Sequence, residues 1–141
     1  MNPTIEKFGY PVTLIKQFEH WLVLLRPAQV TLGSLVLAAK SDATAYSDLL
    51  PAAFAEQADV IAAVEHALAS FVAFERINYL MLMMVDRQVH FHVIPRYSET
   101  RTWNGIEFPD MGWPKQPILE SSIALGPDQI DRLTLDVALN F

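Results

Sequence analysis

One segment, residues 52–75, has the periodicity of a long amphipathic helix, and it constrains the fold more than any other part of the sequence. Its apolar residues recur at spacings of three and four, which places them on one helical face. They are Ile61, Val64, Leu68 and Phe71. Pro51 stands directly before the segment, and proline is tolerated in the first turn of a helix. The other apolar runs are short, so we expect strands around one long helix.

Five short apolar runs have the pattern of β-strands. They are residues 12–15, 20–25, 33–38, 78–85 and 88–95. Residues 29–32 are expected to turn the chain between the second run and the third. Only Asp86 and Arg87 separate the last two runs, which predicts antiparallel neighbours. With a last helix beginning at Pro127, the prediction is an α+β fold with an antiparallel sheet, in one domain over residues 1–141.

The composition excludes several classes of protein. Hydrophobic residues make up 52% of the chain and charged residues 18%, which excludes a disordered chain. There is no cysteine, so disulfides and thiolate chemistry are excluded and a cytoplasmic location is expected. The longest apolar run, residues 21–25, is far too short to cross a bilayer. The net charge is -6 with no evident basic stripe, so we expect no long nucleic acid as partner, which leaves a small phosphate ligand open.

The last predicted strand carries two histidines on one face. Side chains alternate in direction along a strand, so Gln88, His90 and His92 share a face. The core face between them consists of Val89, Phe91 and Val93. A rise of roughly 3.3 Å per residue puts the two imidazoles about 7 Å apart. Because imidazole serves as nucleophile, acid, base or metal ligand, the pair alone leaves catalytic, zinc-binding and purely structural roles open.

The wider sequence resembles the histidine-triad (HIT) family. Residues 88–96, QVHFHVIPR, are similar to that family's signature of three alternating histidines followed by Pro-Arg, with only the first histidine replaced. Residues 24–37 (LLRP through GSLVL) resemble its strand, turn and Pro-Gly-His segment, and residues 46–49 (YSDL) resemble the start of its long helix. The resemblance extends over residues 20–96, more than half of the chain, with the segments in the same order.

The resemblance implies an α+β fold, a homodimer and a small nucleotide bound against the histidine strand. In that family the central histidine attacks the α-phosphate of a nucleotide and forms a covalent nucleotidyl-histidine, which water or another phosphate then resolves. His90 takes this position. His92 takes that of the third histidine, which we expect to bind phosphate oxygens and stabilise developing charge. No protein-bound metal is implied, and magnesium enters only as a companion of a polyphosphate substrate.

The sequence departs from the family pattern at three places. Gln88 replaces the first triad histidine, and its amide can donate a hydrogen bond to phosphate but cannot carry a proton. Ser34 replaces the histidine of the Pro-Gly-His segment. The glycine-rich phosphate loop is expected to be missing, because two residues leave no room for it. The substrate-binding residues predicted beside Gln88 and Ser34 are therefore Arg26 and Arg87, which would supply positive charge.

Residues 98–119 are rich in proline, glycine and tryptophan, and we expect an ordered surface loop there. Its aromatic residues Trp103, Phe108 and Trp113 fit two interpretations, an anchor to the body of the protein and a lid over the substrate. On the lid hypothesis, Trp103 and Trp113 stack on the nucleobase and join the predicted substrate-binding residues. The methionines of the fourth predicted strand are expected to fill the core. They are Met81, Met83 and Met84.

Three functional hypotheses follow. The leading one is a nucleotide hydrolase or nucleotidyl transferase that works through His90. The second is a nucleotide-binding module of the same fold with little or no turnover, which the three departures favour. The third is a metal-dependent hydrolase that uses His90 and His92 as ligands. It needs a third ligand. His20 and His66 are poor candidates, because His20 opens a different strand and His66 lies off the apolar face of the long helix.

Overall fold

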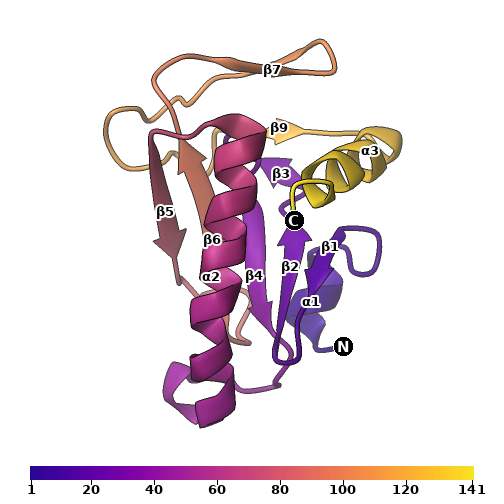
Figure 1. Ribbon diagram of the computed structural model, residues 1–141, viewed down its shortest axis with the longest axis vertical. Helices are drawn as coiled ribbons and strands as arrows, with labels where there is room; N and C mark the ends of the chain where they lie inside the picture. The colour runs from indigo at the N-terminus through magenta and orange to yellow at the C-terminus, as the bar shows by residue number, and fades with distance from the viewer.

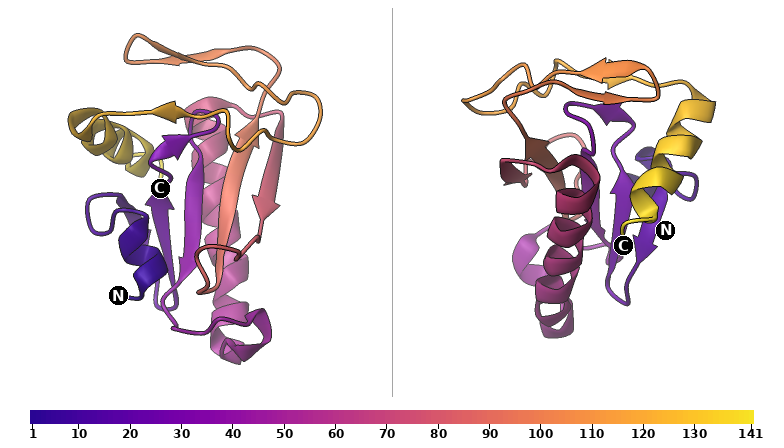
Figure 2. Two further views of the ribbon diagram at one scale, coloured as in Figure 1. Left: turned by 180° about the vertical axis from the view of Figure 1, so that it is seen from behind. Right: turned by 45° about the horizontal axis from the view of Figure 1, so that its top comes forward.

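A five-stranded antiparallel sheet forms the centre of the computed structural model, which describes residues 1–141 (Figure 1). The strand order is β1-β2-β4-β6-β5. These strands are β1 (Leu14–Gln17), β2 (Trp21–Leu25), β4 (Leu35–Ala39), β5 (Arg76–Leu80) and β6 (His90–Arg96). The long helix covers one face and a short N-terminal helix lies against the other (Figure 2). The predicted α+β class is confirmed.

The remaining elements surround this sheet. The helices are α1 (Pro3–Lys7), α2 (Pro51–Val72) and α3 (Pro127–Ala138), with one 3₁₀ turn, η1 (Tyr46–Asp48). Two small ribbons pair β3 (Ala28–Gln29) with β9 (Ile123–Ala124), and β7 (Arg101–Trp103) with β8 (Ile106–Phe108). Strands β1, β2, β4 and β6 begin and end within two residues of the predicted runs, and β1 is the expected edge strand.

Helix α2 lies where its periodicity predicts it. It begins at Pro51 instead of residue 52 and ends at Val72 instead of residue 75. The end is set by Ala73, which adopts a left-handed conformation with φ of 49° and donates its N–H to the carbonyl of Ala69 at 3.1 Å. This bond satisfies one of the carbonyls that a helix end leaves open, and the chain then turns back into β5.

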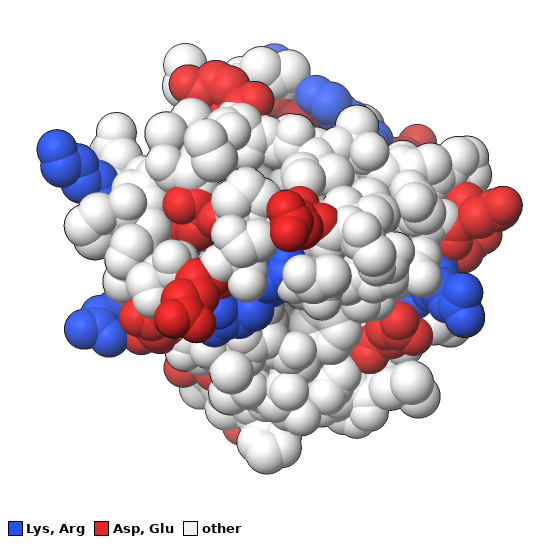
Figure 3. Space-filling view, turned by 90° about the horizontal axis from the view of Figure 1, so that it is seen from above, with Lys and Arg blue, Asp and Glu red and all other residues white.

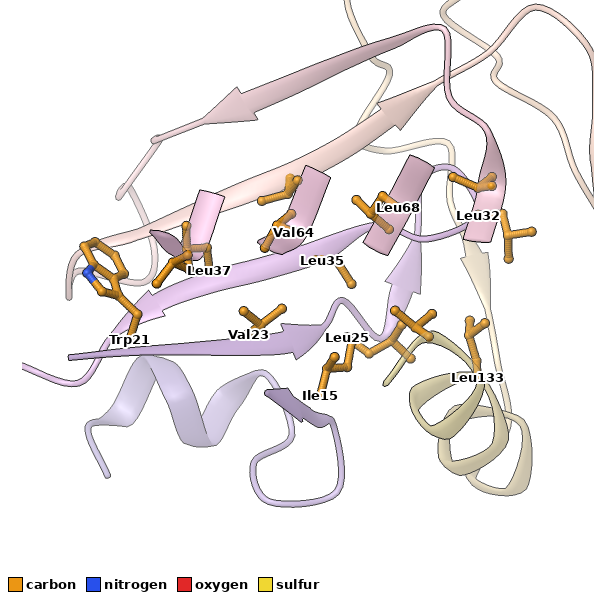
Figure 4. Packing of buried hydrophobic residues seen from close by; sticks show 14 of the residues in the cluster. Ile15, Trp21, Val23, Leu25, Leu32, Leu35, Leu37, Val64, Leu68 and Leu133 are labelled. Carbon is orange, nitrogen blue, oxygen red and sulfur yellow. The ribbon is translucent and has the colours of Figure 1, made fainter. Parts of the chain in front are cut away.

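The apolar face of α2 packs against β2, β4 and β6 and forms the main core (Figure 4). Trp21 lies at one end of this core, where its indole N–H donates to the carbonyl of Ala53 at 2.8 Å. Leu133 of α3 lies at the other end. Each fully buried side chain of this kind contributes about 1.5–3 kcal/mol relative to an exposed one. Helix α2 therefore covers one face of the sheet and leaves the opposite face open to other contacts.

On the opposite side, α1 covers only part of the sheet. Ile5 of α1 packs against an apolar patch made by Leu22, Leu24, Val36 and Ala38. The Asn2 side chain caps α1 by accepting from the N–H of Ile5 at 3.0 Å. Its amide also donates to the carbonyls of Ala39 at 3.1 Å and Ser41 at 2.9 Å. A single side chain thus fixes α1 to the end of β4, and this helix was not predicted.

The connection between β5 and β6 is longer than predicted, which corrects two expectations. Strand β5 pairs with β6 only as far as Leu80, opposite His92, and so ends there instead of at residue 85. Met83 then turns the chain with φ of 50°, a conformation outside the strand region. Residues 81–89 form the connection. The expected two-residue turn was wrong, and so was the expectation that there is no room for a loop beside the histidines.

The methionines of this connection differ from one another in burial. Met81 and Met83 are partly buried and pack against the main core, as predicted. Met84 is 84% exposed and the neighbouring Val85 is 80% exposed. The prediction that Met84 fills the core was therefore wrong, because the chain leaves the sheet before reaching it.

Residues 98–119 contain more regular structure than a surface loop. Strands β7 and β8 form a hairpin whose two turn residues, Asn104 and Gly105, have φ of 51° and 76°. Asn-Gly is the sequence most typical of such a two-residue turn, because both positions need positive φ. The signal for the hairpin was thus present in the sequence. This ribbon crosses one end of the sheet (Figure 1).

The surface seen from above mixes acidic, basic and uncharged side chains. On this face no continuous basic stripe is visible (Figure 3). None of the helices combines the length and the apolar character that crossing a membrane requires.

Candidate active site

His90 and His92 lie side by side at the start of β6, on the sheet face that α1 partly covers. They stand opposite Ala38 and Val36 of β4, respectively. His90 is 1% exposed and His92 is 8% exposed. Their ring centroids are 5.2 Å apart, with the planes at 78°. The two imidazoles therefore share one face, as the alternation along the strand predicts.

One hydrogen bond determines which nitrogen of His90 carries the proton. Nδ1 lies 2.7 Å from the backbone carbonyl oxygen of Gln88. A carbonyl oxygen can only accept, so Nδ1 is the donor. In the neutral ring, Nε2 then keeps its lone pair. His90 is thereby held as the tautomer whose Nε2 can act as a nucleophile or a base.

His92 is held in the opposite tautomer. Arg26 donates from Nε to Nδ1 of His92 at 3.2 Å, and a guanidinium has no acceptor. Nε2 of His92 therefore carries the proton. The pKa of His92 is lowered to about 4, chiefly by burial and to a smaller extent by Arg26 and His90, while Asp86 partly opposes the shift. The ring is neutral at pH 7, and the pair offers one bare nitrogen beside one N–H donor.

The two histidines line a cavity of about 390 Å³. Its polar wall consists of Lys7, Arg26, Asp86, His90 and His92, and its apolar wall of Phe8 and residues 82–85. The Phe8 ring lies 5.7 Å from each imidazole, measured between centroids. Lys7 and Arg26 are two cations against the single carboxylate of Asp86, so the cavity is suitable for an anion that also has an apolar part.

An ion pair joins the two sides of the cavity. Lys7 Nζ lies 2.8 Å from Asp86 Oδ1, which links the end of α1 to the β5–β6 connection. The Lys7 side chain is half exposed, so solvent screens the pair and its net contribution to folding is small. A phosphate entering the cavity would compete with the Asp86 carboxylate for this ammonium group.

A larger cavity, of about 760 Å³, lies beside β5 and has a different lining. It contains no histidine. Its buried cation, Arg96, is already bound to Asp110 by hydrogen bonds of 2.7 and 3.0 Å, and to Asn78 by one of 2.8 Å. The smaller histidine cavity is therefore the candidate active site, because the Nε2 atoms of His90 and His92 remain available for a ligand.

Solved structures share the fold of this protein over nearly the whole chain. A histidine-triad protein from Sinorhizobium meliloti superimposes with a TM-score of 0.70 at 20% identity, covering 100% of this chain and 96% of that one. A histidine-triad protein from Bradyrhizobium japonicum gives 0.69 at 18% identity, covering 99% and 96%. A hypothetical histidine-triad nucleotide-binding protein from Sulfolobus tokodaii gives 0.68 at 18% identity, covering 97% and 88%.

The chain has the histidine-triad fold. No protein-family model matches this sequence, and no curated protein matches it either. At such low identity the likeness concerns the fold, so the site has to be judged from its own residues.

Gln88, which stands at the first position of the histidine-triad signature, turns away from the histidine cavity. Its side-chain oxygen accepts a hydrogen bond from the Thr4 hydroxyl at 2.6 Å, which ties it to α1. Arg87 is exposed. Both line a neighbouring cavity of about 260 Å³ next to α1. Of the predicted substrate-binding residues, only Arg26 joins His90 and His92 in one cavity.

Ser34, at the position of the histidine in the Pro-Gly-His segment, lies inside the β2–β4 connection. It is fully buried. Its hydroxyl donates to the carbonyl of Thr31 at 2.8 Å and accepts from the N–H of Thr31 at 3.0 Å. The structure does not bring Ser34 to the histidine cavity, because its hydrogen bonds are used to hold the turn.

The two tryptophans of the lid hypothesis also lie elsewhere in this histidine-triad fold. Trp103 Nε1 donates to the Asp136 carboxylate on α3 at 2.9 Å, and the ring packs against the main core. Trp113 lines the larger cavity beside β5. Phe108 is buried in the main core. The contacts of Trp103 and Phe108 are those of the anchor interpretation, and neither tryptophan lines the histidine cavity.

The other lining residues of the cavity were not predicted: Lys7, Phe8, Asp86 and residues 82–85. The Asn2-Pro3 pair is a helix-start signal that could have revealed α1. That this helix would carry Lys7 and Phe8 to the histidines could not be foreseen, because the contact joins distant parts of the chain. No group of three or more His, Asp or Glu side chains is placed to hold a metal ion.

Proposed function

We propose that this chain is a nucleotide hydrolase or nucleotidyl transferase that acts on the α-phosphate of a nucleotide phosphoanhydride or phosphoramidate, through a covalent nucleotidyl-histidine at His90. One observation carries the proposal. Two neighbouring imidazoles offer opposite functions, a bare Nε2 on His90 and an Nε2–H on His92. Attack on phosphorus needs a nucleophile beside a donor for the phosphate oxygens. The Sulfolobus tokodaii protein of the same fold, described as nucleotide-binding, supports the substrate class.

In the first step, the lone pair of His90 Nε2 forms a bond to the α-phosphorus. The bond from phosphorus to the leaving oxygen or nitrogen breaks, and the leaving group keeps the electron pair and takes a proton from water. The imidazole becomes cationic, and the carbonyl of Gln88, 2.7 Å from Nδ1, stabilises that charge. Water or a second phosphate then attacks phosphorus, and the electron pair of the P–N bond returns to Nε2.

Three groups of the polar wall would stabilise the phosphate during these steps. His92 donates its Nε2–H as a neutral group, because its lowered pKa keeps it unprotonated on Nδ1 at pH 7. Arg26 and Lys7 supply positive charge from either side of the cavity. Charge-assisted hydrogen bonds of this kind are roughly twice as strong as neutral ones, which suits a phosphate that gains negative charge on attack.

The alternative is a nucleotide-binding module of the same fold with little or no turnover. Gln88 favours this alternative, because its side chain is hydrogen-bonded to Thr4 and an amide cannot carry a proton. The leaving group then has only water as its acid, which slows departure unless that group is already a weak base.

Trapping the covalent intermediate decides between these two functions. The protein is mixed with a nucleoside phosphoramidate labelled on the α-phosphate, quenched in alkaline denaturant, and assayed for protein-bound label. We expect label on the wild type and none on His90→Ala, with turnover lowered by at least about a thousandfold. His66→Ala, an exposed histidine on α2, is the matched control and keeps the label.

The outcomes separate cleanly when each variant is also melted to confirm that it folds. Label or full turnover in a folded His90→Ala protein would remove His90 from the mechanism. Nucleotide binding without label or turnover in the wild type would assign the binding module instead.

We also propose a homodimer. Strand β5 ends the sheet and has no strand on its outer side, whereas α3 packs against β1 at the other edge. An open strand edge presents unpaired N–H and carbonyl groups that a second chain can satisfy. Light scattering at micromolar protein is expected to give twice the chain mass, and a monomer mass would contradict the proposal.

A further inference from the structure

Four consecutive apolar residues of the β5–β6 connection line the histidine cavity. They are Leu82, Met83, Met84 and Val85. Leu82 is 49% exposed, and Met84 and Val85 are more exposed still. Met83 is partly buried against the main core, whereas Leu82, Met84 and Val85 do not fill the core. The connection therefore places the hydrocarbon of these three side chains in contact with water at the mouth of the site.

Two further observations suggest that this exposure serves a ligand. Contiguous exposed apolar residues on a soluble protein mark binding sites, because leaving them in water is unfavourable. Met83, at the centre of the run, has a left-handed backbone with φ of 50°. A residue other than glycine adopts this conformation only at a cost, and such residues cluster at ligand sites.

The chemistry of the wall narrows the choice of ligand. Side chains of Leu, Met and Val offer no hydrogen-bond donor and at most a weak thioether acceptor. A nucleobase has polar edges that such a wall would leave unsatisfied. An aliphatic group has none, and unbranched methionines adapt to flexible apolar ligands. The wall therefore fits a hydrocarbon chain better than a base.

The opposite wall determines what that chain is attached to. Lys7, Arg26, His90 and His92 lie across the same cavity of about 390 Å³. A ligand that fills it has an anionic group against these residues and an apolar group against residues 82–85. One molecule satisfies both walls when the hydrocarbon is joined directly to the phosphate.

We infer that residues 82–85 bind an aliphatic leaving group on the substrate's phosphate, so that the substrate class is nucleotide phosphoramidates or phosphoanhydrides whose leaving group carries a chain of several carbons. The inference rests on the proposed function for the place of the phosphate. The reaction is unchanged: the bond from the α-phosphorus to the nitrogen of the phosphoramidate, or to the bridging oxygen of the anhydride, breaks. The electron pair leaves with the alkylamine or with the alkyl phosphate.

Binding of alkylphosphonates tests this without requiring turnover. Methyl-, butyl- and hexylphosphonate are titrated into the wild type by calorimetry. We expect Kd to fall roughly tenfold from methyl to butyl, because each partly buried methylene gains less than the approximately fourfold of full burial. The double variant Met84→Ser, Val85→Ser is expected to lose most of this dependence on chain length.

A matched control comes from the end of α3. Leu139 is 84% exposed, as Met84 is, and does not line the cavity. Leu139→Ser is expected to keep the full dependence on chain length. Because all three positions are exposed, the variants should melt at the wild-type temperature, which is measured alongside.

Two results would overturn the inference. One is a wild-type Kd that does not change with chain length. The other is a double variant whose Kd depends on chain length as strongly as that of the wild type. If light scattering also shows this variant as a monomer, residues 82–85 belong to a contact between two copies of the chain. If Kd depends on chain length but no label is trapped on the protein, only the catalytic proposal is rejected. If label is trapped but Kd does not depend on chain length, only this inference is rejected.

Discussion

The two connections that flank the histidine pair use their side chains in opposite ways. In the β2–β4 connection, Gln29, Thr31 and Ser34 are polar and completely buried. In the β5–β6 connection, Met84 and Val85 are apolar and largely exposed. Polar residues serve the architecture in the first connection, whereas apolar residues lie at the candidate active site in the second. Residue type alone therefore does not indicate which connection carries function.

The buried connection is stable because its polar groups are satisfied. The Gln29 amide donates to the carbonyls of Arg26 at 2.6 Å and Ser34 at 2.9 Å. Its oxygen accepts from the N–H groups of Gly33 at 2.8 Å and Ser34 at 3.2 Å. Gly33 has φ of 89°, and a Cβ there would lie 3.2 Å from the Leu68 side chain. One glutamine and one glycine thus let the turn pass beneath α2.

The largest effect in this contrast is expected for Gln29→Ala. The substitution leaves two buried carbonyls and two buried N–H groups without this partner, at about 1–3 kcal/mol for each group that stays unsatisfied. We expect the free energy of unfolding to fall by about 3–5 kcal/mol and the melting temperature by roughly 10 °C or more. Gln17→Ala, exposed on β1, is the control. Equal losses of unfolding free energy in both variants would show that the buried hydrogen bonds of Gln29 do not stabilise the β2–β4 connection.

A second test concerns Arg26 and His92, whose hydrogen bond joins the buried β2–β4 connection to the candidate active site. The pKa of His92 is lowered to about 4 from an ordinary value of 6.5, so the unfolded chain binds the proton more readily. The stability that results is complete above pH 6.5 and is lost as the pH falls toward 4. Denaturant unfolding at pH 7 and pH 4.5 should show a loss of about 2 kcal/mol in the wild type that is absent in His92→Gln. Equal losses in both proteins would show that His92 is not the group responsible.

A smaller effect is expected in the exposed connection for Asp86→Asn. Removing the half-exposed pair with Lys7 should change the free energy of unfolding by less than about 1 kcal/mol. Binding of AMP should tighten about threefold, because a negative charge near the cavity is removed and Lys7 is released. Asp59→Asn, on the exposed side of α2, is the charge-matched control. Weaker AMP binding in Asp86→Asn would mean that Asp86 orders the site.

The smallest effect is expected for Gln88→His. The bond that sets the His90 tautomer uses the backbone carbonyl of Gln88, so the substitution should leave it intact. We expect the fold to be kept and kcat/KM to be raised or unchanged, since a histidine here restores the three-histidine pattern. A large loss of kcat/KM, measured with one phosphoramidate, would instead indicate that the hydrogen bond between the Gln88 side chain and Thr4 is needed to hold α1 at the site.

Local patterns account for what the sequence predicted. Helix α2 and most strands follow from periodicity, and the shared face of His90 and His92 follows from alternation along one strand. The end of β5 at Leu80 could not be predicted, because residues 81–85 continue the apolar pattern although the chain has left the sheet. An apolar run indicates a buried strand only where the pairing partner extends equally far.

The candidate site was predicted only in part for a related reason. Two of its polar groups, His90 and His92, lie on one strand, and Arg26 directly follows another. Lys7 and Phe8 reach the cavity from α1, through a contact that no local pattern encodes. Ser34 was expected at the site because of its position in a motif, whereas its burial depends on Gln29 and on neighbours across the sheet.

The attachment of α1 has a consequence for the order in which the site is assembled. The anchors of this helix lie far along the chain: they are the carbonyls of Ala39 and Ser41 and the side chain of Gln88. The bond from Thr4 to Gln88 closes a loop of more than half the chain, which makes it entropically late. Asn2 can therefore hold α1 at the end of β4 before the bond to Gln88 forms, whereas the wall that carries Lys7 is joined to the β5–β6 connection last.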